Sequence, residues 1–293
     1  MSGRFGAVVT AMATPFTEQG DLDLEAARSL ARWLLDTGTD ALVVHGSTGE
    51  AATMTDGEKA DLVRLVKEVA GDAPVIAGTG TYDTRHSIHL SEAARDAGAD
   101  ALLIVCPYYN KPPQRGVVAH YRAIAEAVDL PVLAYNIPGR TAMRIEHGTL
   151  LQLAEIPGVV GVKDATADLD GVSRLIAEAP AGFEVYSGDD WATFAMVALG
   201  AVGVISVAAH LAGERMGQMI ALAQSGDAGG ARKIHESLLP LYRGLFITSN
   251  PIPLKAALDL AGHPVGPPRL PLVPATEDER AAIRKAMEDA GVL

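Results

Sequence analysis

Lys163 interrupts an otherwise apolar segment, Val159–Val162, and is the most informative single residue of the chain. The other six lysines fall in predicted helices or in a loop. Burial penalises an ammonium, and a pKa lowered by about three units leaves about a quarter of the amine neutral at pH 7. A neutral amine can attack a keto carbon and form a Schiff base. The alternative is a structural lysine that is ion-paired with Asp164 or Glu50, and Lys163 alone does not decide between the two.

Tyr135 lies near the end of another apolar segment, Val132–Asn136. Schiff-base chemistry on a keto acid requires a group that carries protons between the carbinolamine, the imine and the enamine. A phenol can do this without adding a competing charge. Tyr135 can also be an ordinary buried tyrosine with a satisfied hydroxyl. Its position on the neighbouring predicted strand favours the catalytic interpretation of Lys163.

Two further features suit carboxylate groups. Ser47 and Thr48 offer adjacent hydroxyls in a glycine-flanked turn, where backbone N–H groups can also bind a small carboxylate. The alternative for this turn is a plain helix cap, which Ser and Thr favour. Arg140 carries a planar fork that matches a second carboxylate, although an isolated arginine more often forms a surface ion pair.

Other chemistries have weaker support in the sequence. Gly78–Gly80 lacks the third glycine of a dinucleotide-binding turn, and there is no phosphate-binding loop or nucleophile elbow. His86 and His89 share a predicted helix face, but no third ligand completes a metal site. Asp189 and Asp190 are adjacent acids of the kind that more often cap the next helix. We therefore expect neither a metal ion nor an organic cofactor.

Eight short segments rich in Val, Ile, Leu and Ala alternate with longer amphipathic stretches. Most lack a polar face, which is typical of buried parallel strands. The predicted strands are Gly6–Pro15, Ala41–Ser47, Val75–Gly80, Ala101–Pro107, Val132–Asn136, Val159–Lys163, Phe183–Ser187 and Gly203–Val207. The polar residues described above follow or end these strands, where a closed parallel barrel places its working groups. The sequence therefore predicts a (β/α)₈ barrel, also called a TIM barrel.

Amphipathic helices are predicted between the strands. The clearest are Leu24–Asp36, Asp56–Ala70, Thr84–Ala97 and Val117–Ala127. The expected N-caps are Asp21, Thr55 and Asp83, and the expected C-terminal stops are Gly38, Gly71 and Gly98. Residues 36–41 recur almost unchanged at 96–101, as one helix-to-strand connection used twice.

The chain continues beyond the eighth predicted helix, Ala212–Gln224. Three more helical patterns follow, at Ala228–Phe246, Pro253–Ala261 and Thr276–Ala290, with the proline-rich Pro264–Pro274 between the last two. We therefore divide the chain into a catalytic barrel, residues 1–226, and a C-terminal helical region, residues 227–293.

Composition limits the compartment and the partners. The net charge of −12 argues against a nucleic-acid-binding surface. Cys106 is the only cysteine, so an intramolecular disulfide is excluded. Met1–Phe5 lack the layout of a secretory signal, and no apolar run reaches about 18 residues. We expect a cytoplasmic protein with no membrane span.

Taken together, the strand ends resemble those of the pyruvate-dependent class I aldolases, the family that includes the dihydrodipicolinate synthases and the N-acetylneuraminate lyases. The resemblance runs in order from about Gly6 to Pro274 and includes the C-terminal helices. The matching stretches are Gly46–Glu50, Pro107–Pro112, Tyr135–Thr141, Gly161–Thr166, Ser187–Asp190, Gly203–Val207 and Asn250–Lys255.

The resemblance implies four catalytic residues. Lys163 attacks the keto carbon of pyruvate, and no cofactor is needed because the lysine supplies the electron sink. Tyr135, Ser47 and Tyr109 relay protons, and Tyr109 is contributed by a neighbouring chain. This shared tyrosine implies an oligomer, which we expect to be a homotetramer built as a dimer of dimers.

The resemblance also implies how the substrates are held. Thr48 helps to hold the pyruvate carboxylate, and Arg140 holds the carboxylate of the aldehyde substrate. Gly188 and the backbone carbonyl of Ile205 line the pocket.

Three features resemble the synthase branch more than the lyase branch, namely Tyr108–Pro112, Arg140 and Asn250–Lys255. One feature departs from the synthase branch. Ser47-Thr48 stands where synthases usually have two threonines, and this pair is familiar from the lyases. Serine keeps the hydroxyl, so the proton relay can survive. The implied reaction joins pyruvate to L-aspartate 4-semialdehyde and gives 4-hydroxy-tetrahydrodipicolinate for lysine (diaminopimelate) biosynthesis.

Two alternatives remain open. The first is a pyruvate lyase of the same family that acts on a sugar acid. The second is a non-catalytic ligand-binding barrel, against which the intact Lys163 and Tyr135 argue.

Feedback by lysine is expected to be weak or absent. Where lysine-inhibited members of the family carry polar or acidic contacts, this chain has Asp56, Lys59, Tyr82 and His86. The ammonium of Lys59 and a protonated His86 disfavour a cationic effector.

Overall fold

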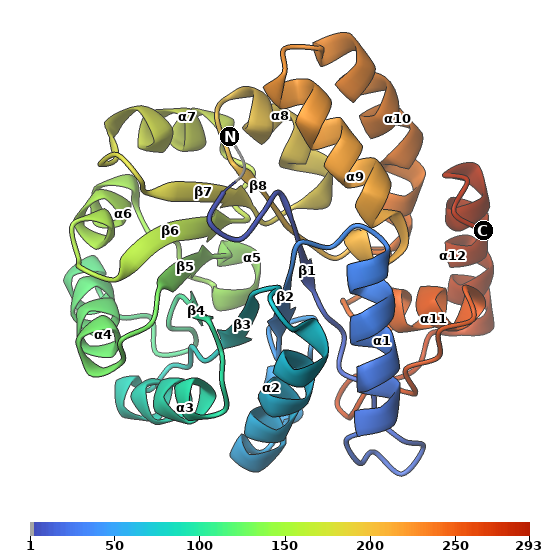
Figure 1. Cartoon of the computed structure of the whole chain (residues 1–293), viewed down its shortest axis with the longest axis horizontal. Coiled ribbons are helices and arrows are strands. Elements are labelled where there is room, and N and C mark those ends of the chain that lie inside the picture. The colour runs from blue at the N-terminus through green and yellow to red at the C-terminus, as the bar shows by residue number, and fades with distance from the viewer. Residues whose placement is uncertain (1–2) are drawn as a thin grey trace.

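The barrel predicted from the sequence is confirmed in a computed structural model, which describes residues 3–293. Met1 and Ser2, part of the N-terminal segment discussed above, lie outside the described residues. Eight parallel strands close into a ring in chain order, with β8 paired to β1 (Figure 1). They are β1 (Val8–Ala11), β2 (Ala41–Val44), β3 (Val75–Gly78), β4 (Ala101–Val105), β5 (Val132–Asn136), β6 (Val159–Asp164), β7 (Glu184–Ser187) and β8 (Gly203–Ser206).

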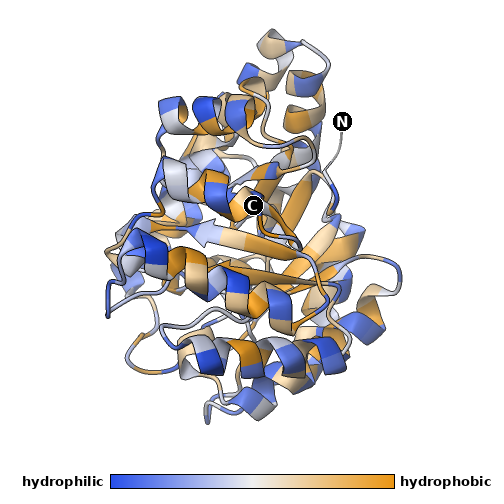
Figure 2. Ribbon diagram, turned by 90° about the vertical axis from the view of Figure 1, so that its left-hand side faces the viewer, coloured by the Kyte–Doolittle hydropathy of each residue, from blue (hydrophilic) through white to orange (hydrophobic). Residues whose placement is uncertain are grey.

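Helices cover the outside of this ring, except the four-residue α5, which lies at the carboxyl end of β5 (Figure 1). They are α1 (Leu24–Asp36), α2 (Asp56–Ala70), α3 (Thr84–Asp96), α4 (Gln114–Ala127), α5 (Pro138–Thr141), α6 (His147–Ala154), α7 (Leu169–Glu178), α8 (Thr193–Ala198) and α9 (Ala209–Gln224). Two short 3₁₀ helices, η1 (Ala51–Thr53) and η2 (Asp190–Ala192), precede α2 and α8. Figure 2 shows largely apolar strands inside and helices whose colours alternate between polar and apolar.

The C-terminal region forms three further helices, α10 (Ala228–Gly244), α11 (Ile252–Leu260) and α12 (Glu277–Asp289). Helix α10 packs along α9, and α12 packs on both α10 and α11. Figure 1 shows this group on the side of the barrel that carries α9 and α1. The expected helical region is therefore confirmed, and it is joined to the barrel by direct packing.

Several predicted boundaries were wrong. Strand β2 ends at Val44, because His45 adopts a left-handed backbone with φ 37°. Helix α1 is capped by Asp23, whose side chain accepts from the N–H of Ala26. Asp21 instead lies in the preceding turn, where its backbone carbonyl accepts from the N–H of Thr17. Helix α4 begins at Gln114, three residues before the expected start.

The other helix signals were correct. Thr55 forms a capping box with Glu58, and Asp83 caps α3. Gly38, Gly71 and Gly98 follow the ends of α1, α2 and α3 with positive φ, where a glycine carries little strain.

The core has two parts. Apolar side chains such as those of Val9, Ile76 and Leu133 fill the inside of the barrel, and a larger set packs between strands and helices. A filled barrel cannot conduct a ligand, so the working groups must lie at one end of it. Within residues 3–293, no helix combines the length and the apolar character needed to cross a membrane.

Candidate active site

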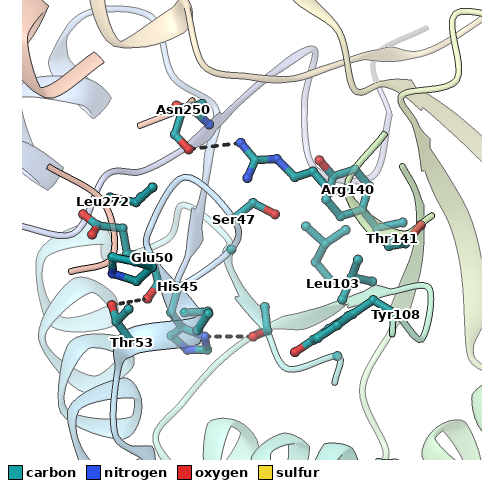
Figure 3. A pocket seen from close by; sticks show the side chains of 18 residues that line it. His45, Ser47, Glu50, Thr53, Leu103, Tyr108, Arg140, Thr141, Asn250 and Leu272 are labelled. Carbon is teal, nitrogen blue, oxygen red and sulfur yellow. Dashed lines mark hydrogen bonds between the residues drawn. The ribbon is translucent and has the colours of Figure 1, made fainter. Parts of the chain in front are cut away.

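A cavity of about 350 Å³ opens at the carboxyl ends of β2 to β5. The loop after β2 forms one wall, and side chains of β4, β5 and α5 form the other (Figure 3). Asn250, Pro271 and Leu272 of the C-terminal region close the remaining side. Both predicted parts of the chain therefore contribute to this cavity.

Lys163 and Tyr135 are brought together by strand register. They are direct partners on β6 and β5, and the Lys163 Nζ lies 4.3 Å from the centre of the Tyr135 ring. Lys163 is only 5% exposed. Tyr135 lines the cavity, whereas Lys163 is not among the lining residues. The Lys163 side chain instead packs against the ring of Tyr135.

Lys163 forms no ion pair with any of residues 3–293. Asp164 binds the side chains of Asn136 and Thr166, and Glu50 pairs with Lys255. The alternative of an ion-paired structural lysine is therefore wrong. Burial lowers the pKa of Lys163 to about 8, although the nearby acids Asp190 and Asp189 oppose this shift. The amine is thus partly neutral near neutral pH, as a nucleophile requires.

Tyr135 stays protonated at the same pH. Burial raises the pKa of its phenol well above the usual range, and the positive charge of Arg140 and hydrogen bonding with Ser47 oppose that rise. A buried, protonated phenol next to an amine can donate its proton and accept it back during a reaction. The pair therefore has the arrangement that Schiff-base chemistry needs.

The loop after β2 is held in one shape by close backbone packing. A Cβ atom at Gly49 would lie 2.9 Å from the Cα of His45 and 3.0 Å from the Thr14 hydroxyl, so only glycine fits. Ser47 lines the cavity, and Thr48 is buried behind it. Neither hydroxyl caps a helix, because η1 has no side-chain cap and Thr55 caps α2. The capping alternative is therefore wrong.

Arg140 lies on the short helix α5 and lines the cavity. Its guanidinium donates to the backbone carbonyl of Asn250 at 3.0 Å, and it forms no ion pair within residues 3–293. Figure 3 shows this contact across the top of the cavity. The surface ion pair considered above is therefore wrong, and the remaining guanidinium N–H groups are free for an anion.

Tyr109 does not reach the cavity of its own chain. It is 90% exposed, with a positive φ of 66°, and its neighbour Tyr108 lines the cavity instead. Tyr82 is also exposed and packs edge-on against Tyr108. Two tyrosines therefore project from the surface beside the cavity.

Gly188 and Ile205 are not among the residues that line the cavity. Gly188 follows β7 and donates its N–H to the carbonyl of Asp164 at 2.7 Å. A Cβ atom there would lie 2.8 Å from the Cβ of Ala165, which explains the glycine. Ile205 is in β8, and its side chain belongs to the barrel interior.

The adjacent acids after β7 do not cap η2. Asp190 is buried and accepts from the Ser206 hydroxyl and from the N–H of Ala208, so it ties β7 to the start of α9. Asp189 makes no capping bond. Among residues 3–293, no group of three or more His, Cys, Asp or Glu is placed to hold a metal ion.

Sequence reasoning assigned no role to Asn250 or to the ion pair of Glu50. The Glu50 carboxylate contacts the Lys255 ammonium at 2.8 Å and accepts from the N–H of Arg269 at 2.9 Å. The ring of Phe16 contacts both cations. Asn250 and Lys255 were part of a matching stretch, but nothing in their local sequence indicated contacts with the β2 loop.

Breaking this buried pair is expected to destabilise the protein. Replacing Lys255 by Met leaves the Glu50 carboxylate buried without a counter-charge, which costs about 3–5 kcal/mol of unfolding free energy. Urea unfolding measures the loss. The double variant Glu50→Gln with Lys255→Met should recover part of it, and equal stability of the single variant and the native chain would contradict the expectation.

Comparison with known proteins agrees with this geometry. The model of the dihydrodipicolinate synthetase family matches residues 4–290. The chain belongs to that family. A 4-hydroxy-tetrahydrodipicolinate synthase of Moorella thermoacetica is 50% identical over 99% of this chain and 100% of its own length. The chain is therefore an enzyme of the family, and the resemblance found in the sequence is confirmed.

Solved structures of the family share the whole fold. The dihydrodipicolinate synthase of Cyanidioschyzon merolae, determined with lysine bound, has a TM-score of 0.97 and 42% identity over all of both chains. The chloride-inhibited synthase of Acinetobacter baumannii, complexed with pyruvate, has a TM-score of 0.96 and 42% identity over 99% of this chain and 100% of that one.

Proposed function

We propose that this enzyme condenses pyruvate with L-aspartate 4-semialdehyde and forms 4-hydroxy-tetrahydrodipicolinate for lysine and diaminopimelate biosynthesis. One observation carries the proposal. Lys163 is buried, forms no ion pair within residues 3–293, and lies against the protonated Tyr135, which lines a cavity together with Ser47 and Arg140. The names of the synthase relatives support the same product.

The neutral amine of Lys163 attacks the keto carbon of pyruvate, and loss of water gives the imine. The imine withdraws electrons, so the methyl group loses a proton and becomes an enamine. The enamine carbon then attacks the aldehyde carbon, and the alkoxide takes a proton from Tyr135. Attack of the substrate's amine on the imine carbon closes the ring and frees Lys163.

The proton relay consists of Tyr135, Ser47 and the Tyr109 of a neighbouring chain. Ser47 has only one hydroxyl, as a threonine does, so the replacement of threonine leaves the relay intact. Because the lysine itself stabilises the carbanion, the reaction needs no metal or organic cofactor.

The two substrates are held by different groups. Thr48 donates to the pyruvate carboxylate, and Arg140 binds the carboxylate of the aldehyde. The resemblance also placed Gly188 and the carbonyl of Ile205 at the pocket, but neither is among the residues that line this cavity, and we assign them no contact with substrate.

Replacing Arg140 by alanine should affect the KM of the two substrates differently. We expect the KM for aspartate semialdehyde to rise about tenfold or more, because a charge-assisted contact is lost. The KM for pyruvate should change much less. Steady-state kinetics with each substrate varied in turn measure the difference, and an equal rise in both constants would contradict the assigned role.

We propose a homotetramer. The exposed Tyr82 and Tyr109 support one interface between subunits. Sedimentation analysis tests the oligomeric state.

A cytoplasmic location is part of the proposal, because Cys106 is a buried free thiol. We also propose the division into residues 1–226 and 227–293.

Weak or absent feedback by lysine is expected. Lys59 and His86 both lie near Asp56, at 3.7 and 3.0 Å, so this carboxylate already has cationic or hydrogen-bonding partners. A lysine titration of the activity measures the effect. Strong inhibition at sub-millimolar lysine would contradict the expectation.

Reductive trapping tests the proposal. Borohydride added with pyruvate should fix a three-carbon adduct on the peptide that contains Lys163, as seen by mass spectrometry. Condensation with aspartate semialdehyde should then be measurable. An adduct on another lysine would overturn the mechanism, and cleavage of sugar acids without condensation would identify a lyase instead.

A further inference from the structure

Asn250 joins the two groups that are proposed to hold substrate carboxylates. It lies between α10 and α11, is 5% exposed, and lines the cavity. Its neighbours in the sequence belong to the C-terminal region, yet its partners lie on the barrel. Figure 3 shows it above Ser47 and in contact with Arg140.

The first partner is Thr48. The Nδ2 group of Asn250 donates to the Thr48 hydroxyl oxygen at 2.9 Å, and the two residues are 202 positions apart in the chain. A hydroxyl that accepts on its oxygen keeps its own proton for another acceptor. The contact therefore leaves the Thr48 proton free to donate to a carboxylate.

The second partner is Arg140, whose guanidinium donates to the backbone carbonyl of Asn250 at 3.0 Å. This contact uses the main chain, so it survives a change of side chain. One residue therefore touches both carboxylate-binding groups, through different atoms.

The third polar group of Asn250 has no partner. Its Oδ1 is buried and accepts no hydrogen bond from residues 3–293. An unfilled buried acceptor costs free energy, so a ligand that supplies a donor there gains affinity. Pyruvate has no N–H or O–H group at neutral pH. L-aspartate 4-semialdehyde has an α-ammonium.

The ammonium and the carboxylate of an α-amino acid share one carbon, so their binding groups must be adjacent. Asn250 contacts Arg140 directly, which meets this requirement. Glu50 is the only acid among the lining residues of this cavity. Both of its oxygens are already engaged, by Lys255 and by Arg269.

We infer that Asn250 is a specificity-determining residue: its Oδ1 accepts from the α-ammonium of the aldehyde substrate, and its Nδ2 orients the Thr48 hydroxyl toward pyruvate. The inference rests on the proposed function. It gives the enzyme a means to distinguish an amino aldehyde from the same aldehyde without the amine.

Two variants separate the two roles. Asn250→Ala removes both the donor and the acceptor, whereas Asn250→Asp keeps an acceptor and loses the donor. For each protein, the KM for pyruvate, the KM for aspartate semialdehyde and the inhibition constant of succinate semialdehyde, which lacks the amine, are measured. Arg140→Ala is the matched control, because it should weaken both aldehydes equally.

For Asn250→Ala, we expect the preference for aspartate semialdehyde over succinate semialdehyde to fall about tenfold and the KM for pyruvate to rise about tenfold. Asn250→Asp should keep the preference and still raise the KM for pyruvate. In a Thr48→Val background, Asn250→Ala should add little to the pyruvate effect.

Each result bears on the inference. An unchanged aldehyde preference in Asn250→Ala overturns the ammonium role, and an unchanged KM for pyruvate overturns the role toward Thr48. If Asn250→Ala does not fold, as judged by circular dichroism, loss of the preference in Asn250→Asp overturns the ammonium role instead. If the native enzyme neither traps pyruvate nor condenses it, the proposed function fails, independently of Asn250.

Discussion

Replacing Lys163 by alanine should lower turnover by at least about a thousandfold, because no other amine can form the imine with pyruvate. The side chain is buried against Tyr135 and forms no ion pair within residues 3–293, so its removal leaves no buried counter-charge unpaired. The fold should therefore persist. Steady-state kinetics and thermal unfolding of the same preparation measure the two effects.

The control variants are Lys163→Arg and Lys285→Ala. Arginine keeps a cation at the site but cannot form the imine, so Lys163→Arg should be as inactive as Lys163→Ala. Lys285 lies on the exposed face of α12 and pairs with Asp289, so its loss should leave kcat unchanged. Substantial turnover in Lys163→Ala would refute the Schiff-base mechanism.

The same amine should govern the pH dependence of imine formation. Because only the neutral amine attacks, and the pKa of Lys163 is lowered to about 8, the trapping rate should rise with pH up to about 8 and level off above it. Below that value the rate should fall about tenfold for each pH unit. The initial rate of borohydride trapping across pH 6 to about 9.5 measures the profile. With an ordinary lysine, the trapping rate would continue to rise through pH 10.

Replacing Tyr135 by phenylalanine should lower kcat by about 10² to 10⁴, because the proton carrier is lost while the ring remains. The Schiff base should still form on Lys163, more slowly. Trapped adduct per subunit and kcat are the two measurements. A large loss of kcat with little loss of trapped adduct indicates a lost proton relay, whereas loss of both indicates a lost nucleophile.

Tyr121→Phe is the matched control for this variant. Tyr121 is also fully buried, but its hydroxyl donates to the carbonyl of Ile104 and it does not line the cavity. Its loss should reduce stability and leave kcat nearly unchanged. A similar loss of kcat in both variants would show that Tyr135 acts through the packing of the barrel.

Local sequence was sufficient to predict the barrel. Buried parallel strands need apolar side chains on both faces, so the eight strands stand out as short runs between amphipathic helices. Lys163 stood out for the same reason, because a charged side chain directly follows the apolar segment Val159–Val162. The end of β2 was predicted incorrectly, because the backbone turn at His45 depends on φ and not on hydrophobicity.

The sequence by itself indicated the architecture, the candidate nucleophile Lys163 and the set of polar strand ends, because each is encoded within a few consecutive residues. Only the tertiary structure decided which polar groups meet. It placed Glu50 against Lys255, left Lys163 without an ion pair within residues 3–293, and brought Asn250 to Thr48 from 202 positions away. Such contacts depend on barrel closure and on the packing of the C-terminal helices, which no local pattern records.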